Sequence, residues 1–205
     1  MAISHSTTLI DYLAPPSSTS RSLNLLRDTG LVLGFSAFLA LCAQVSFHIP
    51  FTPVPITLQT LAVLLAGAVL GSKRGAVTML VYLAEGAVGM PVFAGGTGGF
   101  IHLLGFTGGY LWSYPIAAFV VGLLCEKGLD RSFLTSAVAM LPGSLIIYAI
   151  GVPWLAVTLH LSPSAAILQG MVPFIPGDLF KLLIAAALLP TAWRFVRTIQ
   201  PEEEQ

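Results

Sequence analysis

Long apolar stretches separated by short polar breaks dominate the pattern of this 205-residue chain. A helix needs about 20 mostly apolar residues to cross the hydrocarbon layer of a membrane, with a usable range of about 17–25. The predicted spans are 30–47, 57–71, 75–90, 108–125, 133–158 and 164–193. The third is short for a full span, and Pro173 and Pro176 divide the last into two shorter pieces. The pattern therefore predicts an all-α integral membrane protein with six transmembrane helices.

The basic residues orient these predicted spans. Eight of the nine Lys and Arg residues lie before the first span, between the second and third, between the fourth and fifth, or after the sixth. In that order they are Arg21 and Arg27, Lys73 and Arg74, Lys127 and Arg131, and Arg194 and Arg197. The connections near 48–56, 91–107 and 159–163 contain no Lys or Arg. Because cytoplasmic loops carry the excess of basic residues, both termini are predicted to be cytoplasmic.

Composition supports a membrane location. Hydrophobic residues make up 56% of the chain and charged residues only 9%, against about a quarter charged in soluble domains. The formal net charge is zero and no basic patch occurs, so nucleic acid is not a predicted partner. We divide the chain into a flexible cytoplasmic leader (1–29), a transmembrane domain (30–193) and a cytoplasmic tail (194–205).

Three ionisable side chains lie inside the predicted spans: Glu85, Asp178 and Lys181. On insertion scales each costs about 2.5–3.5 kcal/mol at the bilayer centre unless it faces a cavity or a partner, so such residues are candidates for function. All three can meet in the outer half of the bundle.

The spacing of Asp178 and Lys181 favours a binding role. Three residues apart, they share a helix face and offer acceptors beside three donors. Mutual neutralisation is the alternative, but a Leu pair would pack there without the desolvation cost. "IPGDLFK" also indicates a helix start, with Pro176 in the first turn and Asp178 near the positive end of the dipole. The pair is thus predicted to bind a small molecule that carries N–H groups and carbonyl or carboxylate oxygens.

Two connections on the predicted outer side are candidates to complete a binding site. Three prolines between 46 and 60 favour a stiff, extended segment that can cover a cavity. Its hydrogen-bonding side chains are Thr57, Gln59 and Thr60. Between 90 and 110, glycines such as Gly95 and Gly96 allow close approach of the backbone to a ligand, although no phosphate-loop motif is present.

The first span has small residues on one face, with Ser36 and Ala40 four residues apart. Small faces let membrane helices approach closely, and the pattern fits either an internal helix or a partner protein.

Catalytic and metal chemistry have weak support. Cys42 and Cys125 stand alone in apolar runs, no Cys/His metal motif occurs, and no nucleophile is spaced with a base. No enzyme activity, cofactor or metal is therefore predicted.

Three longer motifs resemble a known family. "PVPITLQTLAVLLAGAVLGSKRGA" (53–76), "YLAEGAVGMPVFAGG" (82–96) and "TGGYLWSYPIAAFVVGLL" (107–124) closely resemble the BioY family. These are the biotin-binding S components of energy-coupling-factor (ECF) transporters, and the resemblance covers about 31–193.

The resemblance implies biotin capture in a cavity near the outer face of a bacterial cytoplasmic membrane. Transport would be driven by a separate module of one transmembrane coupling protein and two ATPases. The implied biotin-binding residues are Asp178, Lys181, Thr57, Gln59, Gly95 and Gly96, with Glu85 a further candidate and Tyr82, Phe93 and Tyr110 as apolar walls. Ser36 and Ala40 are the nearest equivalents of the family's docking surface.

A stand-alone secondary transporter, coupled to protons through Glu85 or Asp178, is the alternative function. The chain has no Walker motif, so it cannot hydrolyse ATP itself. Uptake by this chain alone that responds to pH or to an uncoupler would identify that alternative.

Overall fold

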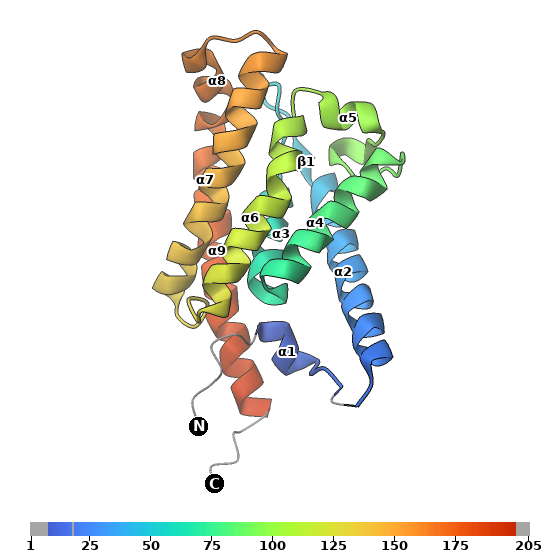
Figure 1. Ribbon diagram of the computed structural model, residues 1–205. Coiled ribbons are helices and arrows are strands. Elements are labelled where there is room, and N and C mark those ends of the chain that lie inside the picture. Colours follow the sequence, from blue (N-terminus) through green and yellow to red (C-terminus); the bar gives the residue numbers. More distant parts are fainter. Residues whose placement is uncertain (1–7, 18, 200–205) are drawn as a thin grey trace.

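The computed structural model describes residues 8–17 and 19–199, and this part of the chain is mostly helical (Figure 1). The helices are joined by one pair of two-residue strands and by two short 3-10 helices, η1 and η2. In chain order the elements are α1 (Leu9–Leu13), α2 (Arg21–Gln44), β1 (Ser46–Phe47), β2 (Ile56–Thr57), α3 (Gln59–Leu70), α4 (Ser72–Ala87), η1 (Ala94–Gly96), α5 (Phe100–Leu104), α6 (Gly108–Glu126), α7 (Phe133–Thr158), α8 (Pro163–Gly170), η2 (Val172–Phe174) and α9 (Ile175–Ile199).

Four helical stretches in the described residues are long and apolar enough to cross a membrane, as expected of a multi-pass membrane protein. They are Arg21–Gln44, Gly108–Glu126, Phe133–Thr158 and Pro163–Val196. The spans predicted at 57–71 and 75–90 correspond to α3 and α4, which have 12 and 16 residues. Both are shorter than a full crossing requires, so the count of six spans stays a prediction.

Helix α6 lies at the centre of the bundle and packs against α3, α4 and α7. Two glycines permit this packing. A Cβ atom on Gly67 of α3 would lie 2.4 Å from the carbonyl oxygen of Ala118, and one on Gly122 would lie 2.3 Å from the backbone nitrogen of Ser72. At these points α6 therefore contacts α3 and α4 backbone to backbone, as small residues allow in membrane helices.

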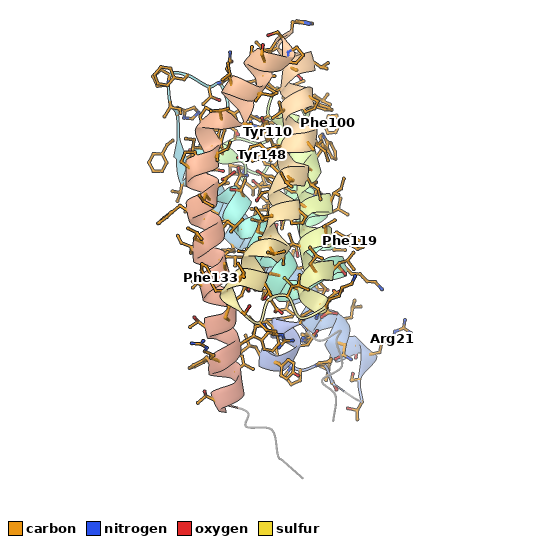
Figure 2. The ribbon with its side chains drawn as sticks, turned by 90° about the vertical axis from the view of Figure 1, so that its left-hand side faces the viewer. Arg21, Phe100, Tyr110, Phe119, Phe133 and Tyr148 are labelled. Carbon is orange, nitrogen blue, oxygen red and sulfur yellow. The ribbon has the colours of Figure 1, made fainter. Side chains whose placement is uncertain are left out.

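The bundle has two distinct ends. Helix α1 and the last turns of α9 lie at one end, whereas β1, α5 and α8 lie at the other (Figure 1). Figure 2 shows Arg21 near the first end, with Tyr110 and Tyr148 in the half of the bundle away from it. The connections that contain His48, His102 and His160 therefore lie at the end opposite α1.

Two helical segments lie within the range 1–29 that the sequence predicts as a leader. Ser20 caps α2, because its side chain accepts a hydrogen bond from the Leu23 backbone N–H at 3.4 Å. Helix α2 therefore begins at Arg21 rather than at residue 30, and α1 precedes it. Residues 1–7 and 18 of the predicted leader lie outside the described residues.

The C-terminal end also departs from its predicted boundary. Helix α9 runs to Ile199, so the predicted tail 194–205 begins as helix, and residues 200–205 lie outside the described residues. The interruption predicted near Pro173 and Pro176 is confirmed: η2 separates α8 from α9, and Pro176 lies in the first turn of α9.

Candidate functional site

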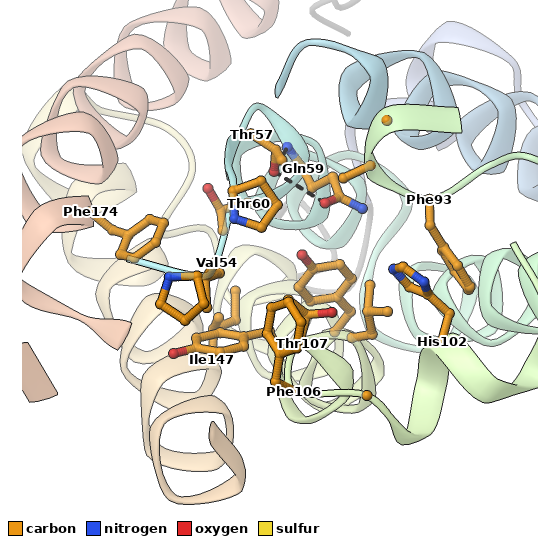
Figure 3. Close-up of a pocket in the computed structure, with 18 of the residues that line it drawn as sticks. Val54, Thr57, Gln59, Thr60, Phe93, His102, Phe106, Thr107, Ile147 and Phe174 are labelled. Atoms are coloured by element: carbon orange, nitrogen blue, oxygen red, sulfur yellow. Dashed lines mark hydrogen bonds between the residues drawn. The ribbon is translucent and has the colours of Figure 1, made fainter. Parts of the chain in front are cut away.

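A cavity of about 460 Å³ lies toward the end of the bundle opposite α1. Figure 3 shows residues that line it. Its wall combines the β1–β2 connection and the segment from η1 to α5 with side chains of α3, α6, α7 and α9. The lining is mostly apolar with a few polar groups. Small-molecule sites have volumes of about 300–1,000 Å³ and this same mixture of surfaces.

The Asp178–Lys181 pair lies in this cavity, near the start of α9. Lys181 Nζ donates to Asp178 Oδ1 at 2.8 Å. The Lys181 side chain is 9% exposed and the Asp178 side chain is 13% exposed. Asp178 is in the first turn of α9, where free backbone N–H groups and the helix dipole favour a negative charge. The sequence prediction therefore placed the pair correctly on one helix face and at a helix start.

Two neighbouring helices complete the environment of the pair. Thr60 of α3 accepts from Lys181 Nζ at 3.0 Å and donates to Asp178 Oδ1 at 3.1 Å. Tyr148 of α7 donates its hydroxyl hydrogen to Asp178 Oδ2. The four side chains join α3, α7 and α9 in one hydrogen-bonded group, which we call the charged cluster: Thr60, Tyr148, Asp178 and Lys181.

Sequence reasoning named Thr60 only as a polar group of the covering loop, and it missed Tyr148. The available signal was a tyrosine hydroxyl in the mostly apolar stretch 133–158, which also contains four Ser and Thr residues. A tyrosine can also pack as an apolar residue, so this signal is weaker than that of a charge.

The predicted residues Thr57 and Gln59 line the cavity and connect it to the interior. Thr57 Oγ1 donates to Gln59 Oε1 at 3.1 Å, a contact drawn in Figure 3. Gln59 Nε2 donates to the Tyr82 hydroxyl at 2.7 Å, and Tyr82 donates in turn to the Val92 carbonyl at 2.9 Å. Tyr82 is fully buried behind the wall, so it supports Gln59 and is not part of the lining as predicted.

The glycine-rich segment contributes Phe93 and Gly95 to the lining, whereas Gly96 lies outside it. The Phe93 ring stacks on His102, with ring centroids 5.4 Å apart, and both side chains appear at one side of the cavity in Figure 3. Burial lowers the pKa of the His102 imidazole, which favours its neutral form at this wall.

Glu85 lies away from the charged cluster and does not line the cavity, in contrast to our expectation. It accepts a hydrogen bond from the Ser36 hydroxyl at 2.5 Å and so links α4 to α2. Ser36 is fully buried, whereas Ala40 is partly buried and packs against the core. Ser36 therefore takes part in internal packing, and a docking role for Ala40 stays a prediction.

The donor set of the cavity favours an organic ligand over a metal ion. Among residues 8–17 and 19–199, no three His, Cys, Asp or Glu side chains gather as a candidate metal site. The polar groups of the cavity are hydroxyls, an amide, imidazoles, one ammonium and one carboxylate.

A helical membrane protein that encloses a ligand-sized cavity with a few buried polar groups falls into the class of membrane substrate-binding and transport proteins. The family model of BioY matches residues 14–198, and the chain belongs to the BioY family. This confirms the resemblance found in the sequence and extends it at both ends.

Individual relatives agree with this assignment. The "Probable biotin transporter BioY" of Pyrococcus horikoshii is 44% identical over 162 residues, which cover 79% of this chain and 93% of the relative. The "Biotin transporter BioY" of Thermotoga maritima is 44% identical over 154 residues, covering 75% and 88%. These relatives are named as transporters, which supports the prediction that the chain is not an enzyme.

A solved structure shares the fold. The chain superimposes on the crystal structure of the S-component for biotin from an ECF-type ABC transporter with a TM-score of 0.77 and 25% sequence identity. The match covers 86% of this chain and 95% of that chain.

Proposed function

We propose that this chain captures biotin in the cavity and delivers it into the cell as the S component of an ECF-type transporter. The observation that carries the proposal is the buried charged cluster inside a ligand-sized cavity of a BioY-family chain. The names of its relatives and the similarity to a biotin S component point to the same ligand.

The chemistry of biotin matches the two kinds of surface in the cavity. Biotin carries a cyclic urea with two N–H donors and one carbonyl acceptor, an apolar thiophane ring, and a chain that ends in a carboxylate. The charged cluster supplies donors and acceptors, while Phe93, Phe106, Ile147 and Phe174 supply apolar contact area (Figure 3). The β1–β2 connection, with Val54 among its lining residues, acts as the cover.

We further propose that the chain crosses the cytoplasmic membrane six times, through α2, α3, α4, α6, α7 and the combined α8–α9. Basic residues support an orientation in which the end of the bundle with α1 faces the cytoplasm. Arg74 contacts α1 through Asp11, and Arg131 packs over the Trp193 ring near the end of α9. The bundle end that gathers these basic residues is therefore assigned to the cytoplasm, and the cavity to the outer side.

We also propose that the coupling protein docks in a groove between α2, α3 and α9, and not at the position of Ser36 and Ala40. The groove has a volume of about 500 Å³ and is lined almost wholly by apolar residues. Gly30 and Gly34 of α2 line it, and a Cβ atom on either would meet nothing within 4 Å. A transmembrane helix of the coupling protein can approach such a face closely.

Uptake of labelled biotin tests the proposal. It is measured in cells unable to synthesise biotin, with this chain expressed alone and together with a coupling protein and two ATPases. We expect full uptake only with the module, and its loss when the Walker lysines of the ATPases are substituted. Uptake by the chain alone that collapses with a protonophore would instead favour the stand-alone, proton-coupled transporter.

A further inference from the structure

Helix α5 presents three apolar side chains on its outer surface. Phe100, Ile101 and Leu104 are 57%, 77% and 48% exposed, whereas Leu103, on the side of the bundle, is buried. The segment 91–107 contains no Lys, Arg, Asp or Glu residue. Exposed apolar surface of this kind marks a contact with another protein or with a membrane. We refer to Phe100, Ile101 and Leu104 as the α5 patch.

The inner side of the same helix forms part of the cavity wall. His102 lines the cavity with its ring stacked on Phe93, and Ile101 belongs both to the lining and to the α5 patch. Gly105 and Phe106, which follow α5, also line the cavity. The surroundings of the α5 patch therefore lie directly behind one wall of the ligand site.

The backbone at the C-terminal end of α5 is hydrogen-bonded to two long helices. The Leu103 carbonyl accepts from the Trp112 indole N–H of α6 at 3.0 Å. The Gly105 carbonyl accepts from the Trp154 indole N–H of α7 at 2.9 Å. The last carbonyl groups of a helix lack partners within the helix, and in lipid they need partners elsewhere in the protein. Since tryptophan is also enriched at membrane interfaces, both features favour lipid as the surroundings of α5.

The α5 patch continues the exposed side of a helix long enough to cross the membrane. On α6, the exposed residues Trp112, Ile116 and Phe119 share one face. Figure 2 shows Phe100 and Phe119 on the same side of the bundle, and Figure 1 shows α5 lower than the connection between α7 and α8. Helix α5 thus lies beside the half of the bundle that contains the cavity, and not beyond its end.

We propose that the α5 patch inserts into the outer leaflet of the membrane and that this anchor holds one wall of the cavity in position. The inference rests on the proposed function for the ligand and for the orientation of the bundle, and it adds lipid as a structural partner of the site. Because the patch carries no charge, its partner is the apolar region of the lipid, and anionic headgroups are not required. The groove proposed for the coupling protein does not include α5.

Spin labels on single introduced cysteines test the position of α5. The variants Phe100→Cys, Leu104→Cys and Ser164→Cys of the full chain are labelled and placed in phosphatidylcholine vesicles. The native Cys42 and Cys125 are buried, and the parent treated in the same way gives the background. Collisions of each label with oxygen, which concentrates in lipid, are compared with collisions with a water-soluble nickel complex.

We expect the labels at 100 and 104 to favour oxygen, and the label at the exposed Ser164 of α8 to favour the nickel complex. A preference for nickel at 100 and 104 would place α5 in water and overturn the proposal. Labels shielded from both reagents would show that a second copy of the chain covers the patch, which would overturn it as well. These outcomes do not depend on biotin, so they are distinct from a failure of the proposed function.

Biotin affinity in vesicles tests the effect of the anchor on the cavity. Phe100→Ser combined with Leu104→Ser makes the patch polar without changing a lining residue. We expect affinity to fall about 3- to 10-fold, as when the binding-competent wall is populated for only about a tenth to a third of the time. Phe100→Leu combined with Leu104→Phe keeps the patch apolar and should retain the parental affinity. Parental affinity in the serine variant would overturn the role of the anchor, whereas a parent that binds no biotin would contradict the proposed function.

Discussion

Lys181 shows how a single residue is accommodated at membrane depth. An isolated charge there costs about 2.5–3.5 kcal/mol on insertion scales, and a buried pair regains this only when its remaining hydrogen-bonding groups are satisfied. Here Asp178, Thr60 and Tyr148 supply those partners from three helices. Removing either charge leaves the other uncompensated. Asn and Gln keep a hydrogen-bonding group of similar size at these positions and are therefore better probes of binding than Ala.

Gly86 gives a prediction at the residue scale. A Cβ atom on Gly86 would lie 2.0 Å from Cζ of Phe93, a buried ring that lines the cavity. Gly86→Ala should therefore displace the ring, lower stability by about 1–3 kcal/mol as overpacking does, and weaken biotin binding. Thermal unfolding in detergent and equilibrium binding measure the two effects.

Gly34→Ala is the matched control, because a Cβ atom on Gly34 meets nothing within 4 Å. It should leave both the stability and the biotin affinity of the isolated protein unchanged or slightly increase the stability. Equal behaviour of the two variants would contradict the packing described for Phe93.

The predictability of the site varied from residue to residue. Asp178 and Lys181 stood out in the sequence because charges are rare in apolar spans. Glu85 stood out for the same reason, but its partner is Ser36 on a neighbouring helix, and the sequence does not specify the rotation of one helix against another. Tyr148 gave no comparable signal, since only the fold brings its hydroxyl to Asp178.

At the scale of elements, α1 depends on tertiary contacts for its stability. Five residues are too few for an isolated helix, because nucleation is unfavourable. Arg74 holds it through two contacts with Asp11 at 2.7 and 2.8 Å, and Arg27 adds a third at 2.8 Å. Leu9 packs on Trp193, so one short helix links α2, α4 and α9 at the end of the bundle opposite the cavity.

The pH dependence of stability tests this link. Burial alone would raise the pKa of Asp11, but hydrogen bonds from Arg74, Thr8 and Arg27 hold it well below its ordinary value of 3.8. A depressed folded-state pKa adds stability that is complete above the unfolded-state value and is lost as the pH falls below it. The unfolding temperature of the parent should thus fall more steeply below about pH 4 than that of Asp11→Asn.

Asp28→Asn serves as the control. Asp28 pairs with the same two arginines, at 3.0 Å to Arg27 and 3.3 Å to Arg74, but it lies in α2 and does not hold α1. Above pH 5 only Asp11→Asn should increase hydrogen exchange of the α1 amides. Equal exchange in the two variants would show that α1 does not depend on Asp11.

Elements were predicted best where a long apolar run is bounded by clear breaks. The range 133–158 coincides with α7, and 108–125 ends one residue before α6 does. The β1–β2 pairing was missed, because two strands of two residues leave no periodic pattern. Helices α1 and α5 were missed for a similar reason, since five residues are too short to show amphipathic spacing.

At the scale of the whole molecule, binding and docking are assigned to separate regions. The cavity opens at the end with α5 and α8, and the apolar groove lies between α2, α3 and α9. Helix α3 contributes to both, with Gln59 and Thr60 in the cavity and Leu65 and Val69 in the groove. Helix α3 thus connects the cavity to the groove that we propose for docking.

Equilibrium binding of labelled biotin to the purified protein in detergent tests the central claim most directly. We expect saturable binding by the parent, and affinities about 10-fold or more weaker in Asp178→Asn and Lys181→Gln, because each change removes a charge-assisted hydrogen bond. Lys127→Gln removes a charge at the opposite end of the bundle and should bind like the parent. A parent that does not bind biotin, or cluster variants that bind it as tightly as the parent, would contradict the claim that the charged cluster captures biotin.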